Sequence, residues 1–152
     1  HDKQTKIGGD QAHITLLAQN IQGYKNLLKL TSIANFEGFS YRPRIDFEVL
    51  SEYNEGIIAT SGCMNSIFNK LLRENKVEEA RAEFKKYKEV FKDRFYVEIQ
   101  MHPAIEELKK LTKLQVQLAR ELDIPLIGTM NDVKKTVYYP SGSAAFFMVS
   151  SK

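Results

Sequence analysis

Short apolar stretches alternate with helix-like stretches along this chain of 152 residues. The short ones are rich in residues that favour buried strands, namely His13 to Ala18, Gly56 to Thr60, Phe95 to Met101 and Asp123 to Thr129. Between them, apolar residues recur at every third or fourth position, as on one helix face, over residues 21–38, 65–74, 77–91 and 104–122. This alternation predicts an α/β fold in which parallel strands alternate with helices, as an open sheet or a barrel.

The ends of several elements can also be read from the sequence. Asn20 is a good N-cap for the helix that follows it, and a further short helix fits within residues 46–55. The aromatic stretch from Phe36 to Arg44 contains Pro43 and is predicted to be a loop.

We assign residues 1–135 to one domain. Residues 136–152 form an unassigned C-terminal tail, in which the apolar run from Ala144 to Val149 fits one more strand.

Composition is typical of a globular protein outside membranes. The chain is 43% hydrophobic and 27% charged, and its net charge of +3 does not by itself indicate nucleic-acid binding. A single cysteine excludes an internal disulfide and fits a reducing compartment. No apolar run approaches the roughly 20 residues of a membrane span, and residues 1–6 do not show the apolar region expected of a signal peptide. We therefore expect a cytoplasmic protein.

Side chains able to bind a metal follow three of the predicted strands. Cys63, His102 and Asp132 come after successive strands, and such loops meet at one rim of a parallel sheet. Thiolate, imidazole and carboxylate groups are the usual ligands of zinc. Each residue also has a plainer interpretation: Cys63 as a small buried side chain, His102 as a neighbour of the N-cap of the next helix, and Asp132 as a turn cap. Because no His-x-His or His-x-x-x-His spacing is present, the residues alone favour the plainer interpretations over a metal site.

Basic residues raise the question of nucleic-acid binding. Lys25, Arg42 and Arg44, together with the nearby aromatic residues Phe39 and Tyr41, are a weak candidate for contacts with phosphate or bases. The alternative, a loop that packs its aromatic rings and solvates its charges, is favoured. Lysines in residues 77–91 alternate with glutamates, which is typical of a solvated surface. No Walker loop and no Gly-x-Ser-x-Gly motif is present.

A series of short blocks resembles a known family. The blocks, in order, are His13 to Asn20 (HITLLAQN), Gly23 to Leu27 (GYKNL), Pro43 to Asp46, Ser61 to Cys63, Phe95 to His102 and Ile124 to Asp132. In this order and spacing they resemble the PHP (polymerase and histidinol phosphatase) domain of bacterial DNA polymerase III alpha subunits. The resemblance covers roughly residues 12–134, and the run ITLLA followed by GYKNL is its most specific part.

The resemblance implies a distorted TIM-like α/β barrel with metal ligands at the carboxyl ends of its strands. In the family, an intact site binds metals such as zinc or manganese and supports phosphoester hydrolysis, in some members as a 3′–5′ exonuclease. By resemblance, His13, Cys63 and Asp132 match metal ligands, whereas His102 matches a position where we do not expect a ligand. The domain also supports the polymerase in DNA replication, which implies other polymerase parts, replisome proteins and DNA as partners.

The chain departs from the family pattern at two places. The His-x-His strand and further ligands that precede His13 in the family are missing, and residues 1–11 leave no room for them. Lys134 occupies the place of the last histidine, where its charge would oppose a metal. We expect a partial barrel with a degenerate site, no activity of the chain alone, and an open edge covered by a partner, the tail or a second copy. The alternatives are a metal-dependent phosphoesterase or exonuclease that completes its site with another chain, and a non-enzymatic interaction module.

Overall fold

The computed structural model describes residues 11–36, 45–100, 106–129 and 144–150 of the chain. Within these ranges, strands and helices alternate in the order expected from the sequence. The elements are β1 (Gln11–Ala18), α1 (Ile21–Phe36), α2 (Phe47–Glu52), β2 (Ile57–Thr60), α3 (Ile67–Arg73), α4 (Val77–Phe91), the short 3-10 helix η1 (Lys92–Arg94), β3 (Phe95–Gln100), α5 (Glu106–Glu121), β4 (Leu126–Thr129) and β5 (Ala144–Ser150).

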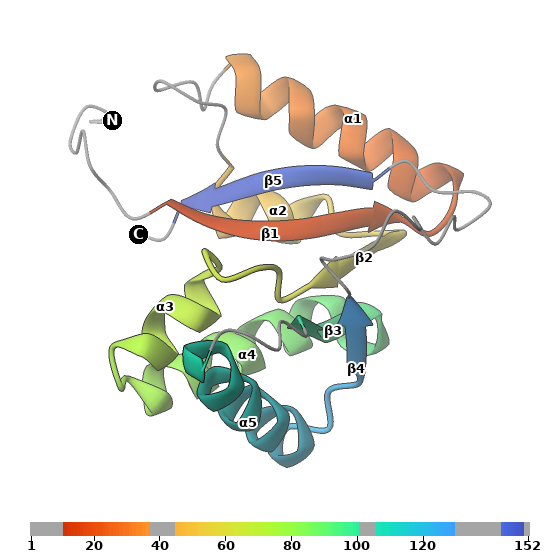
Figure 1. Cartoon of the computed structure of the whole chain (residues 1–152). Helices are drawn as coiled ribbons and strands as arrows, with labels where there is room; N and C mark the ends of the chain where they lie inside the picture. Colours follow the sequence, from red (N-terminus) through yellow and green to blue (C-terminus); the bar gives the residue numbers. More distant parts are fainter. Residues whose placement is uncertain (1–10, 37–44, 101–105, 130–143, 151–152) are drawn as a thin grey trace, which may run out of the picture.

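The described strands form one sheet with the order β4-β3-β2-β1-β5. Strands β2, β3 and β4 are parallel, as the alternation with helices predicts. Strand β1 is antiparallel both to β2 and to β5, which comes from the tail. In Figure 1, α3, α4 and α5 gather around β2, β3 and β4, whereas α1 and α2 accompany β1. The α/β fold class is confirmed, and the described sheet is not closed into a barrel.

The direction of β1 is the main departure from an all-parallel arrangement. A single helix after β1 would return the chain to the end where β1 began, and the next strand would be parallel. Here two helices, α1 and α2, lie between β1 and β2. After α2 the chain lies at the end where β1 finished, because the Gln19 backbone N–H donates to the Gly56 carbonyl at 2.8 Å. Strand β2 therefore starts beside the end of β1 and runs antiparallel to it.

One face of the sheet forms the hydrophobic core. Side chains alternate between the two faces of a strand, and the buried set is Ala12, Ile14, Leu16, Ile57, Ala59, Phe95 and Val97. The helices cover this face with an aromatic cluster in which Phe68 stacks on Phe84, with ring centroids 4.4 Å apart, and meets Tyr87 edge-on. The opposite face carries His13, Thr15 and Tyr96, all half-buried. The polar side chains thus share the face that lies away from the aromatic core.

Polar caps and one close backbone contact fix where the helices start. The side chains of Asn20, Asp46 and Ser66 accept from backbone N–H groups in the first turns of α1, α2 and α3. Helix α1 approaches the start of β2 so closely that a Cβ added at Gly23 would lie 1.7 Å from the Gly56 carbonyl oxygen.

Within the described ranges, no helix is long and apolar enough to cross a membrane.

Candidate functional site

The start of β1 lies at the rim where β2 and β3 end. Thr15 is opposite Thr60, and Thr60 is beside Tyr96. His13, two residues before Thr15, is therefore level with the loop that leaves β2 and with Glu98 on β3. The backbone N–H of His13 donates to the Asn65 carbonyl at 3.1 Å, which joins β1 to that loop. The reversed direction of β1 thus adds its first residues to the rim at the carboxyl ends of β2 and β3.

Two of the predicted ligands, His13 and Cys63, meet at this rim. The imidazole Nδ1 of His13 and the thiol Sγ of Cys63 are 3.5 Å apart, and both side chains are half-buried. For a tetrahedral zinc with bonds of about 2.3 Å to sulfur and 2.05 Å to nitrogen, the two donors would be about 3.6 Å apart. The spacing of the pair fits two ligands of one such metal ion.

The loop that carries Cys63 is held on both sides. After Cys63, its carbonyl accepts from the Ser66 backbone N–H at 2.9 Å and from the Asn69 side-chain amide at 3.1 Å. Before it, Gly62 has a φ of +72°, and a Cβ there would lie 3.0 Å from the His13 carbonyl oxygen. Glycine at this position lets the loop pass close to β1. The backbone therefore fixes Cys63 near His13.

A buried carboxylate that sequence reasoning missed lies at the same level of the sheet. Glu98 is 8% exposed, accepts from the Thr60 hydroxyl at 2.6 Å, and accepts from the Gln100 amide at 3.2 Å. The signal was present in the sequence, because an acidic residue inside the buried strand β3 needs partners. Glu98, Thr60 and Gln100 extend the polar rim from His13 and Cys63 across β3.

The other predicted site residues do not all fall in described parts of the chain. Asp132, His102, Arg42 and Arg44 lie outside the described residues, so their placement stays a prediction. Lys25 is exposed on α1, next to Asn26, whose amide donates to the Glu55 carbonyl at 2.8 Å. That contact is at the start of β2, at the opposite end of the sheet from Cys63. In the portion that the structure describes, no group of three or more His, Cys, Asp or Glu side chains could hold a metal ion.

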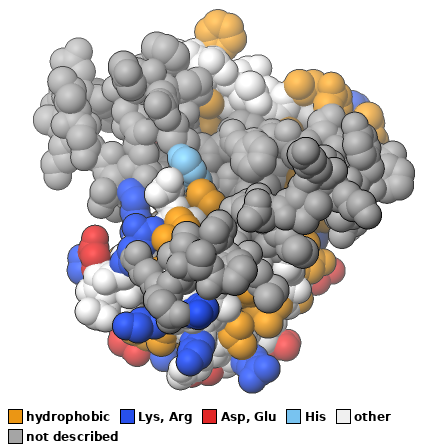
Figure 2. All heavy atoms as spheres, viewed as in Figure 1, with side chains coloured by type: hydrophobic (Ala, Val, Ile, Leu, Met, Phe, Trp, Pro, Cys, Tyr) orange, Lys and Arg blue, Asp and Glu red, His pale blue; other side chains and the backbone are white. Residues whose placement is uncertain are grey.

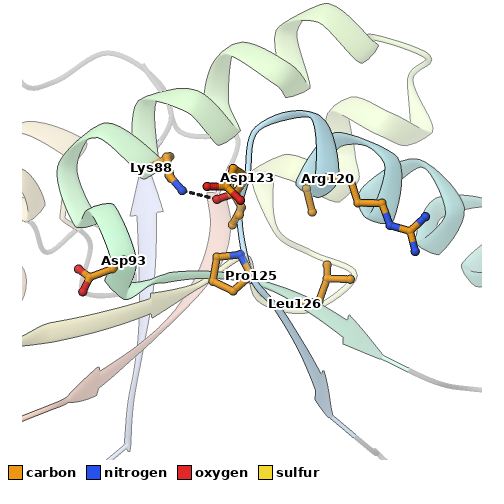
Figure 3. A pocket seen from close by; sticks show the side chains of 8 residues that line it. Lys88, Asp93, Arg120, Asp123, Pro125 and Leu126 are labelled. Atoms are coloured by element: carbon orange, nitrogen blue, oxygen red, sulfur yellow. Dashed lines mark hydrogen bonds between the residues drawn. The ribbon is translucent and has the colours of Figure 1, made fainter.

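A hollow of about 610 Å³ lies at the other end of the sheet, where β3 and β4 begin. It is lined by Lys88, Asp93, Ala119, Arg120, Asp123, Ile124, Pro125 and Leu126. Figure 3 shows Lys88 of α4 reaching the Asp123 backbone carbonyl, to which it donates, while Arg120 points away from Lys88. The charged side chains that line the hollow are of both signs. Functional groups in parallel sheets collect at the carboxyl ends of the strands, whereas this hollow lies where β3 and β4 begin. The hollow is therefore not part of the rim site.

The helices beside this hollow have a surface of mixed charge. Figure 2 shows Lys and Arg side chains interspersed with Asp and Glu over the lower half of the molecule. On α4, Arg81 pairs with Glu78 at 3.2 Å and Lys86 pairs with Glu83 at 3.7 Å. Neighbouring charges of opposite sign leave no continuous basic track. These pairs agree with the solvated surface that the sequence predicts for this helix.

Comparisons with known proteins agree on the family. The PHP domain profile matches residues 2–102, a range that contains His13 and Cys63. The DNA polymerase III subunit alpha of Borreliella burgdorferi is 45% identical over 124 residues, which is 82% of this chain and 11% of that protein. The subunits of Deinococcus radiodurans and Thermus aquaticus are 43% and 37% identical, over 82% and 81% of this chain and 9% and 10% of their own lengths.

The chain therefore spans about a tenth of the length of these relatives. The matched region contains the rim that brings His13 and Cys63 together. The profile names the PHP domain, and these relatives are DNA polymerase III alpha subunits. By its sequence and its α/β fold, this chain belongs to the PHP domain family, in the form found in DNA polymerase III alpha subunits.

Proposed function

We propose that the chain is a PHP segment of a bacterial DNA polymerase III alpha subunit that supports polymerase structure in DNA replication. Its metal site is degenerate, and these 152 residues have no polymerase or nuclease activity by themselves. The proposal rests on a site in which only part of the family's set of metal ligands is present. His13 and Cys63 are spaced as two ligands of one metal, while Lys134 stands where the family pattern has a histidine. Because the chain folds although its set of metal ligands is incomplete, a structural role is favoured over a catalytic one.

The donors of the pair suit zinc better than manganese. Imidazole nitrogen and thiolate sulfur are ligands that zinc prefers, whereas manganese prefers carboxylate and water oxygens. Bound zinc would supply a water of lowered pKa for hydrolysis. Catalytic zinc sites use three protein ligands, and Asp132 is the third that the resemblance suggests. Two donors alone would give weak binding, which is consistent with a chain that is inactive in isolation.

The partners we propose follow from the length of the relatives. A domain that spans about a tenth of such a protein is expected to contact the remaining polymerase domains, and through them other replisome proteins and DNA in the cytoplasm. Helix α1 supports a partner-binding role, because Ile21 is 71% exposed and Leu28 is 52% exposed on its surface. Exposed apolar side chains grouped on one helix suit a protein interface better than a phosphate contact.

The test is the metal content of the purified chain, measured together with its mass in solution and with degradation of single-stranded DNA in added zinc or manganese. We expect less than one zinc per chain and no degradation. Cys63→Ala serves as the matched control for any metal that is found. Robust DNA degradation by the wild-type chain, absent from Cys63→Ala, would contradict the proposal.

The contact between His13 and Cys63 also favours a second candidate, a metal-dependent phosphoesterase or exonuclease that completes its site with another chain. It predicts a stable assembly that contains stoichiometric metal and degrades DNA. A self-associated protein without metal would instead favour the non-enzymatic interaction module. Measuring mass and metal on the same sample separates these two candidates.

A further inference from the structure

Glu98 is a buried acidic residue, and the contact between His13 and Cys63 does not explain why it lies there. Only 8% of it is exposed, and its neighbour on β3, Val97, is fully buried in the apolar core. Burying a carboxylate is costly unless hydrogen bonds compensate it. A neutral or apolar residue would suit a strand whose only role is packing. The contacts of Glu98 therefore indicate what it does.

Glu98 contacts Gln100 within β3, and two further contacts, one of its side chain and one of its backbone, reach the residues just before Cys63. The Thr60 hydroxyl donates to the carboxylate at 2.6 Å, and the Thr60 oxygen in turn accepts from the Gly62 backbone N–H at 3.4 Å. The backbone N–H of Glu98 donates to the Ser61 hydroxyl at 2.9 Å. Through these bonds, Glu98 connects β3 to each of the three residues that precede Cys63.

The loop is also fixed after Cys63 and from the side of β1. Asn69 donates to the Cys63 carbonyl, and the Asn65 carbonyl accepts from the His13 backbone. These bonds hold the end of the loop and the position of His13, whereas the bonds of Glu98 hold its beginning. These connections surround the loop in which Sγ of Cys63 lies 3.5 Å from Nδ1 of His13.

We propose that Glu98 is a positioning residue for Cys63: its side chain holds Thr60, while its backbone N–H holds Ser61, so that the thiol stays against the imidazole of His13. The inference rests on the proposed function in that it concerns the same site, but it describes where the thiol lies and needs no metal. The Thr60 hydroxyl needs a buried acceptor at this position, and the side-chain oxygen of Glu98 supplies it at the start of the loop.

Alkylation of Cys63 tests the proposal directly, because Cys63 is the only cysteine of the chain. The rate of modification by iodoacetamide is measured in EDTA under native conditions for the wild type, Glu98→Ala and Glu98→Gln. Glu98→Ala removes the acceptor of the Thr60 hydroxyl but keeps the backbone bond to Ser61. The start of the loop is then held less tightly, so Cys63 is expected to react about tenfold faster or more. Glu98→Gln keeps an acceptor for the Thr60 hydroxyl and should stay close to the wild-type rate.

The matched control is Asn26→Ala. Asn26 is also a buried polar residue, 9% exposed, but it bonds to Glu55 at the opposite end of the sheet. At equal stability, adjusted with denaturant, Asn26→Ala should leave the alkylation rate unchanged. If Glu98→Ala does not fold, Thr60→Val removes the same hydrogen bond with little change in shape and should give the same faster reaction.

A second readout reports the contact itself. The NMR signals of the His13 ring should shift between the wild type and Cys63→Ala, and this shift should disappear in the Glu98→Ala background.

Alkylation at the wild-type rate in Glu98→Ala, or an equal increase in Asn26→Ala, would overturn the proposal. An increase in Glu98→Gln as large as in Glu98→Ala would overturn the hydrogen-bond mechanism. Because EDTA removes metal, these results are independent of whether the chain binds zinc.

Discussion

His13 and Cys63 are fifty positions apart in the sequence, yet Nδ1 of one and Sγ of the other are separated by 3.5 Å. The contact exists because β1 is antiparallel to β2, so that the first residues of β1 lie beside the loop that leaves β2. Had β1 been parallel, its first residues would lie at the opposite end of the sheet. The antiparallel pairing of β1 with β2 therefore creates the candidate site.

The first prediction concerns metal binding by this pair. Titration with Cd²⁺, a thiol-seeking probe, should produce ultraviolet absorbance from a metal–thiolate bond that is absent in Cys63→Ala. His13→Ala should lower the affinity by at least about tenfold, since losing even an indirect partner of a metal site commonly costs that much. His102→Ala is the control and should bind as the wild type does. Equal absorbance in Cys63→Ala would place the metal elsewhere.

The second prediction concerns the contact between α1 and β2. Gly23→Ala should destabilise the chain by about 1–3 kcal/mol or more, because its new Cβ would lie 1.7 Å from the Gly56 carbonyl oxygen and the helix must move. Gly128→Ala is the control, because a Cβ there meets no atom within 4 Å. Urea denaturation measures both changes. Similar midpoints for the two variants would show that α1 does not pack against β2 in this way.

The third prediction concerns the aromatic cluster. Phe68 is fully buried, stacks on Phe84 and contacts Tyr87 and Phe95. Phe68→Ala should cost about 3–5 kcal/mol in the free energy of unfolding. Phe36, which is 88% exposed at the end of α1, provides the matched control, and Phe36→Ala should change stability by less than about 0.5 kcal/mol. Thermal unfolding of both variants checks the difference.

The fourth prediction concerns alkaline pH. Burial raises the pKa of the Tyr87 phenol well above its usual value of about 10, and the nearby carboxylate of Glu83 raises it further. Above pH 10, the Tyr87 phenol therefore keeps its proton in the folded state, whereas it loses that proton in the unfolded state. The stability due to Tyr87 is complete below pH 10 and falls above it, by up to about 1.4 kcal/mol per pH unit.

Tyr87→Phe isolates this contribution. The ring still fills the same buried position, but no phenol ionises, so stability should fall less steeply above pH 10 than in the wild type. Denaturant midpoints between pH 8 and pH 11 provide the measurement, with the range set by the ordinary phenol pKa of about 10. Parallel curves for the two proteins would show that Tyr87 does not contribute to the pH dependence.

Local patterns in the sequence predicted the elements well. The alternation of apolar runs located the strands that became β1 to β4, and the helix-period segments became α1, α3, α4 and α5. Capping residues were equally readable, because the side chain of Asn20 accepts from the Gly23 backbone N–H at 2.9 Å as an N-cap should. Such features depend on neighbours within a few positions, so a single sequence contains them.

The site was only partly readable in advance. Loops after strands pointed to Cys63, and the family resemblance pointed to His13, but Glu98 was passed over although its acidic side chain lies within a buried strand. Its role depends on Thr60 and Ser61, which come from another strand and the loop after it. No local pattern reveals which residues of different strands will lie side by side.

The sequence by itself determined the α/β class, the order of the elements and the family, because periodicity, capping and motif spacing are local properties of the chain. Only the tertiary structure decided the direction of β1, the meeting of His13 with Cys63, and the burial of Glu98 beside Thr60. The physical reason is that these relationships arise from packing between distant segments. The pairing of β1 with β2 and β5 sets the direction of β1, and burial in the sheet gives an ordinary glutamate its role.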